Sequence, residues 1–206
     1  AIFLVATHDP LALGNGAKES KIRSVVPSGR LWLLAALAGS LAGDVLLLFP
    51  GWCVPGLVAF LVGHLAYLML LRQGVGWFPS RRALAGTLGV GAAMYAFLWT
   101  GGLPTGLRVP VAAYVAVIAL MAAQAIGRAT VMRDTAAWTV AVGAAFFMLS
   151  DSLLATNKFA MPLPLASFWV LTSYYAAQVL IVGGWLRARA GTRPPTRASA
   201  DSLQFQ

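Results

Sequence analysis

Six long apolar stretches divide the chain, and each is long enough to cross a bilayer as a helix. Such a helix needs about 20 residues, with a range of roughly 17–25. The predicted helices cover residues 31–49, 54–71, 83–99, 109–126, 135–157 and 165–186. Short connections that contain Pro and Gly, such as Pro50-Gly51, separate them. The pattern therefore predicts an all-α, polytopic bundle of six transmembrane helices in which consecutive helices run antiparallel.

The composition agrees with the membrane as solvent. Apolar residues make up 59% of the 206 residues and charged residues 10%, against roughly 45–50% and about 25% in soluble domains. A soluble globular protein is therefore excluded. The net charge is +9, but the basic residues lie between the apolar stretches, without the clustered face that nucleic acid requires. No nucleic-acid partner is expected. Cys53 is the single cysteine, which excludes a disulfide within the sequence.

The distribution of Lys and Arg predicts the orientation in the membrane. Of the 15 basic residues, all except Arg108 and Lys158 fall before the first helix, in every second connection, or after the last helix. Cytoplasmic segments of membrane proteins carry an excess of Lys and Arg. We therefore expect a multi-pass protein of the cell membrane with both termini in the cytoplasm.

The two ends of the sequence differ from the bundle. Residues 1–30 carry scattered charges with Gly and Pro, and are expected to form a divergent or truncated N-terminal segment without a cleavable signal. Residues 187–206 are polar and contain Pro and Arg, which is typical of a disordered basic tail. The bundle is thus predicted to cover residues 31–186.

Two carboxylates, Asp44 and Asp151, lie inside predicted helices. A charged residue at the centre of a helix costs about 2.5–3.5 kcal/mol on insertion scales, so an intramembrane carboxylate suggests function. Both helices run outward in the predicted topology, and both carboxylates lie roughly 8–9 Å below the outer boundary at 1.5 Å rise per residue. They can therefore face one cavity that opens outward.

Further polar residues lie inside or at the ends of the helices. The candidates for a site around the carboxylates are Ser40, His64, Tyr67, Ser150, Asn157, Tyr174 and Gln178. For each of them, hydrogen bonding between helices is the alternative explanation. Lys158, at the outer end of the fifth helix, can also serve as an interfacial anchor. No metal site is predicted, because His64 is the only imidazole in the predicted helices and no ligand pair has metal-binding spacing.

Four motifs in order resemble the YhhN-type family of lysoplasmalogenase-like membrane proteins. They are the glycine–aspartate helix LAGSLAGDVLLLF, the Gly-Leu-x-x-Phe and His-x-x-Tyr pattern that follows it, the segment FFMLSDSLLATNKF, and the segment SYYAAQVLI. The resemblance covers about residues 31–186. It implies more spans than the six predicted here, with a helical hairpin containing a Lys-Pro motif before the glycine–aspartate helix. Residues 1–30 do not supply that hairpin.

The resemblance implies an enzyme that hydrolyses the vinyl ether bond of lysoplasmalogen to a fatty aldehyde and a glycerophospho-base, without a cofactor. Protonation of the alkene carbon gives an oxocarbenium ion that water attacks, which requires one acid and one negative charge or base, as in glycoside hydrolysis. Asp44 and Asp151 are expected to share these catalytic roles. The other polar candidates are expected to position water or substrate, and Lys158 to contact the phosphate of the lysophospholipid.

Two other classes of function stay open. A proton-coupled transporter of small molecules or lipids also uses buried Asp and His residues, although the sequence contains no clear inverted repeat. A non-catalytic lipid-binding or scaffold protein would use Asp44 and Asp151 to hold helices together. Transport would move substrate without forming product, and a scaffold would lose its fold when either aspartate is replaced.

Overall fold

The computed structural model describes residues 29–190, and this part of the chain is all-helical, as the apolar pattern predicts. The elements are α2 (Gly29–Leu47), α3 (Cys53–Arg72), α4 (Arg81–Thr100), η1 (Thr105–Leu107), α5 (Arg108–Met132), α6 (Thr135–Ala155), η2 (Thr156–Ala160) and α7 (Ala166–Ala190). By length and composition, six helices of the described part can cross a membrane. The six predicted spans are therefore confirmed, and the chain is a multi-pass membrane protein.

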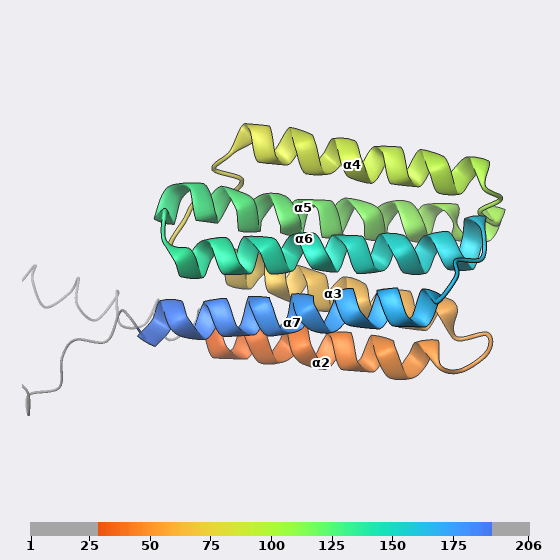
Figure 1. The fold of residues 1–206 in the computed structure, drawn as a ribbon, viewed down its shortest axis with the longest axis horizontal. Helices are drawn as coiled ribbons and strands as arrows, with labels where there is room; N and C mark the ends of the chain where they lie inside the picture. The colour runs from red at the N-terminus through yellow and green to blue at the C-terminus, as the bar shows by residue number, and fades with distance from the viewer. Residues whose placement is uncertain (1–28, 191–206) are drawn as a thin grey trace, which may run out of the picture.

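Three antiparallel pairs of consecutive helices build the bundle. Helix α2 packs on α3, α4 on α5, and α6 on α7, while α5 joins the pairs by contacting both α3 and α6. Figure 1 shows α4 at one edge of the bundle, and α2 and α7 together at the opposite edge. The core lies between α3, α5, α6 and α7, around fully buried side chains such as Tyr67, Met121 and Phe147. Many large apolar side chains remain on the outer surface, as expected for helices that face lipid.

The first and last described residues lie at the same end of the bundle (Figure 1). The basic residues at that end are Arg30, Arg72, Arg81, Arg82, Arg128, Arg133, Arg187 and Arg189. Arg108 and Lys158 lie at the other end. The asymmetry expected from the sequence is therefore present in the fold, and the cytoplasmic location of the Arg-rich end stays a prediction.

Helix α5 continues six residues beyond its predicted end at residue 126. Polar side chains in this extension of the helix and just before it bond to the last turn of α3 and to the connection between α3 and α4. Gln124 accepts a hydrogen bond from the Phe78 N–H (2.8 Å) and donates one to the Gly76 carbonyl (3.0 Å). Arg128 donates to the Leu71 carbonyl. Because these polar groups find partners in the protein, the helix does not have to end where the apolar run ends.

The observed ends of the bundle also differ slightly from the predicted ends. Helix α2 starts at Gly29, and α7 continues to Ala190, so the first four residues of the expected tail are helical. The expectations for residues 1–28 and 191–206 lie outside the described residues. The predicted fifth helix becomes α6 up to Ala155, followed by the π-helical turn η2.

Glycines allow α2 and α3 to approach closely. A Cβ atom added to Gly39 would lie 2.8 Å from the Gly63 backbone, and one added to Gly63 would lie 3.1 Å from the Ala36 carbonyl oxygen. Real Cβ atoms essentially never approach other atoms to less than 3.0 Å. The small residues therefore set the distance between the helix that carries Asp44 and the helix that carries His64.

Candidate functional site

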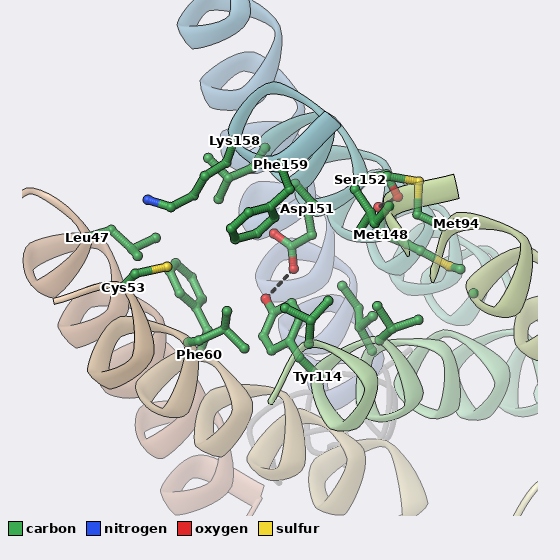
Figure 2. Close-up of a pocket in the computed structure, with 18 residues that line it drawn as sticks. Leu47, Cys53, Phe60, Met94, Tyr114, Met148, Asp151, Ser152, Lys158 and Phe159 are labelled. Atoms are coloured by element: carbon green, nitrogen blue, oxygen red, sulfur yellow. Dashed lines mark hydrogen bonds between the residues drawn. The ribbon is translucent and has the colours of Figure 1, made fainter. Parts of the chain in front are cut away.

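A pocket of about 140 Å³ lies between α3, α4, α5, α6 and η2 (Figure 2). Most of its lining is apolar and includes Leu57, Phe60, Met94, Leu98, Val115 and Ile118. The polar lining residues are Tyr114, Asp151, Ser152 and Lys158. A small number of polar groups in an apolar pocket is typical of a site that binds an amphipathic molecule.

Asp151 places a carboxyl group in this pocket from the last turns of α6. Its side chain is 13% exposed. The Oδ2 atom accepts a hydrogen bond from the Tyr114 hydroxyl group of α5 (Figure 2). The Nε2 atom of His64, from α3, lies 3.8 Å from the same oxygen. Three helices thus surround one carboxyl group, as buried ionisable groups in membranes require.

The orientation of His64 follows from its second nitrogen. Nδ1 lies 2.7 Å from the Phe60 carbonyl oxygen, so Nδ1 carries a proton and donates it to that bond. In the neutral ring, Nε2 then has its lone pair free, on the side of Asp151. The ring packs edge-on against Phe147 and Tyr114, with centroid distances of 4.6 and 5.4 Å. His64 is therefore held at Asp151 by packing and by its backbone hydrogen bond.

Asp44 belongs to a second network, which links α2, α3 and α7. The Tyr174 hydroxyl group donates to Oδ2 of Asp44 (2.7 Å), and Gln178 Nε2 donates to the Tyr174 oxygen (3.2 Å). The Tyr67 hydroxyl group donates to Gln178 Oε1 (2.5 Å). The chain of donors therefore runs from Tyr67 through Gln178 and Tyr174 and ends at the Asp44 carboxylate.

The two carboxylates lie at similar depth, but only one of them lines the pocket. Asp44 is three residues from the end of α2 and Asp151 four from the end of α6, which is roughly 4.5–6 Å along each helix. Both helices end on the same side of the bundle (Figure 1). Asp44 is not a lining residue, in contrast to the expected shared cavity. Phe60 lines the pocket and also packs edge-on against Tyr174, so its ring is in contact with both the pocket and the Asp44 network.

Three of the sequence candidates, Ser40, Ser150 and Asn157, are not part of the pocket lining. The Ser150 hydroxyl group donates to the Val170 carbonyl group (3.1 Å) and links α6 to α7. Asn157 accepts from the Leu163 N–H (2.9 Å) in the connection that follows η2. Ser40 is buried in α2, and its side chain lies beside that of Tyr174, at the Asp44 network.

The two basic residues at this end of the bundle differ in their surroundings. Lys158 lines the pocket, and Figure 2 shows its side chain extending from η2 toward Leu47. The Arg108 guanidinium group instead stacks on the Trp99 ring at 3.9 Å. Lys158 is thus the residue available for an anionic group in the pocket, while Arg108 has a role in anchoring α5 to α4.

Sequence reasoning did not identify Tyr114. It lies inside an apolar stretch, and 37 residues separate it from Asp151. The one available signal was chemical, because a Tyr hydroxyl group inside a membrane needs a hydrogen-bond partner. Nothing in the sequence indicated which partner.

Comparison with known proteins gives matches over most of the chain. Residues 19–185 match the model of the YhhN family. The sequence is 35% identical to human lysoplasmalogenase TMEM86B over 156 residues, which are 76% of this chain and 64% of the human protein. It is 33% identical to the lysoplasmalogenase of Mycobacterium tuberculosis (strain CDC 1551 / Oshkosh) over 170 residues, 78% of this chain and 62% of that protein.

The chain is also 30% identical to bovine lysoplasmalogenase TMEM86A over 154 residues, which are 72% of this chain and 62% of that protein. The chain thus spans a little over three fifths of the length of these curated relatives. No solved structure matches the chain.

Proposed function

The chain belongs to the YhhN family, as its motifs predicted, and from this premise we propose that it is a membrane-embedded hydrolase of the vinyl ether bond of lysoplasmalogen. The curated relatives that match it carry the name lysoplasmalogenase. The observation that carries the proposal is Asp151, a carboxyl group in an apolar pocket with the cation of Lys158 in the same lining.

The pocket has the polarity that a lysophospholipid requires. The apolar side chains of α4, α5 and α6 offer contacts to a single hydrocarbon chain, which can enter from the bilayer between helices. The Lys158 ammonium group contacts the phosphate group at the end of the bundle, where the head group stays in the interface. The vinyl ether bond, between chain and head group, then lies beside Asp151.

The proposed reaction is acid-catalysed hydrolysis. A carboxyl group donates its proton to the alkene carbon of the vinyl ether, and the oxygen-bearing carbon becomes an oxocarbenium ion. Water adds to this ion and returns a proton to the carboxylate. The resulting hemiacetal collapses to a fatty aldehyde and the alcohol of the glycerophospho-base.

Asp44 and Asp151 share the roles of proton donor and negative charge that stabilises the cation. His64 orients the carboxyl group of Asp151. The carboxyl group of Asp44 is oriented by Tyr67, Tyr174 and Gln178. These four residues therefore act on water and substrate through the two carboxylates.

The test is aldehyde release from lysoplasmalogen by the purified protein in detergent. Asp151→Asn is expected to lower kcat by about 10²- to 10⁴-fold, the usual contribution of a positioned acid. A matched control is Asp134→Asn, because Asp134 caps the first turn of α6 at the opposite end of that helix. This control should keep wild-type kcat, and an ester-linked lysophospholipid should release no aldehyde.

Two results would reject the proposal. One is a folded wild-type protein that moves lysolipid across vesicle membranes without forming aldehyde, which would indicate a transporter. The other is equal aldehyde release by the wild type, Asp44→Asn and Asp151→Asn, each monodisperse in gel filtration.

A further inference from the structure

The Asp151 carboxyl group has two oxygens in different surroundings. Oδ2 accepts the hydrogen bond from Tyr114 and is the oxygen nearest to His64. Figure 2 shows the other oxygen, Oδ1, turned away from Tyr114 toward the Phe159 side of the pocket. One oxygen is therefore held by the protein, and the other faces the pocket.

Tyr114 is built into the bundle so that its hydroxyl group stays at this position. Its ring lines the pocket and packs edge-on against His64 at a centroid distance of 5.4 Å. A Tyr side chain has only two rotatable bonds before its ring is fixed, so packing of the ring also fixes the direction of the hydroxyl group. The hydrogen bond joins α5 to α6 and sets the rotation of the carboxyl group about its own axis.

We propose that Tyr114 is a positioning residue of this site, which holds Oδ2 of Asp151 so that Oδ1 delivers the proton to substrate in the pocket. This inference rests on the proposed hydrolysis of a vinyl ether. The inference also assigns Asp151 as the proton donor, because Asp151 faces the pocket, whereas Asp44 ends a hydrogen-bond chain outside the pocket lining.

The proposed role predicts an effect on the chemical step. When Oδ1 gives its proton to the alkene carbon, Asp151 becomes a carboxylate, and the proton returns from the water that adds to the oxocarbenium ion. A hydrogen bond from the Tyr114 hydroxyl group is stronger to the carboxylate than to the neutral acid. It therefore stabilises the transition state more than the bound substrate, and its loss lowers kcat rather than raising KM.

The experiment compares Tyr114→Phe with Tyr95→Phe, both purified in detergent and tested by gel filtration. Tyr95 is a matched control because its hydroxyl group donates to the Arg108 carbonyl group (3.1 Å) and its side chain is not part of the pocket lining. Tyr114→Phe should lower kcat for aldehyde release by about 10- to 100-fold. KM should stay within about twofold. Tyr95→Phe should match the wild type in both values.

A spectroscopic measurement tests the contact independently of activity. The infrared bands of the Asp151 carboxyl group are identified by their loss in Asp151→Asn. They should shift in Tyr114→Phe, which lacks the hydrogen bond, and stay in place in Tyr95→Phe.

The outcomes separate this inference from the proposed function. A wild type without aldehyde release refutes the proposed function and with it the catalytic role of Tyr114. An active wild type with unchanged kcat in Tyr114→Phe refutes the inference alone, as does a variant in which only KM rises. Unmoved infrared bands also refute it, because the hydroxyl group then does not hold Asp151.

Discussion

Replacing Gly39 by Ala is expected to force α2 and α3 apart. The added Cβ atom would lie 2.8 Å from both Cα and N of Gly63. Ordinary van der Waals contact begins at 3.4 Å, so the two helices must separate by about 0.6 Å at this point. The neighbouring atoms belong to backbone, which cannot rotate away as a flexible side chain can.

The loss of stability expected for Gly39→Ala follows from the cost of overpacking. An extra methyl group in a closely packed interface typically costs about 1–3 kcal/mol. For a chain of this size, each kcal/mol shifts Tm by about 2–4 °C. The expected result is thus a fall in Tm of several degrees for Gly39→Ala.

The assay is the fraction of purified protein that stays monodisperse in detergent after heating, measured over a series of temperatures. Gly89→Ala is the matched control, because a Cβ atom at Gly89, inside α4, would meet no atom within 4 Å. This variant should melt at the wild-type temperature or slightly above it, since Ala favours the helix. If Gly39→Ala melted together with Gly89→Ala, the close approach of α2 and α3 would be refuted.

Two further predictions concern the core and the orientation of the chain. Phe147→Ala should destabilise the protein by about 3–5 kcal/mol, because Phe147 is fully buried. Phe168→Ala should have little effect in the same heating assay, because Phe168 is 56% exposed. Equal losses of stability in the two variants would contradict the placement of Phe147 in the core. Cys53 begins α3 at the end of the bundle opposite to the Arg-rich one, so a membrane-impermeant maleimide should label Cys53 in intact cells. The same reagent should not label the cysteine of a Gly76→Cys variant made in a Cys53→Ser background. The reverse labelling pattern would show the opposite orientation.

The amino-acid pattern alone predicted the number of helices, the alternation of their directions and the end of the bundle at which the basic residues gather, but not which helices pack against each other. These features depend on local properties of the chain. An apolar stretch of about 20 residues must form a helix in lipid, because its backbone groups have no other hydrogen-bond partners there. The same argument identified Asp44 and Asp151, since a carboxyl group inside such a stretch is costly.

Tertiary structure decided what the sequence left open. The apolar pattern indicates how far each helix extends, but not its rotation about its own axis, which depends on packing against neighbouring helices. That rotation turns Asp151 into the pocket and Asp44 toward Tyr174. It also brings Tyr114, which the sequence did not single out, to the Asp151 carboxyl group. Helix number and depth follow from the solvent, whereas the contacts of the site follow from how side chains of separate helices fit together.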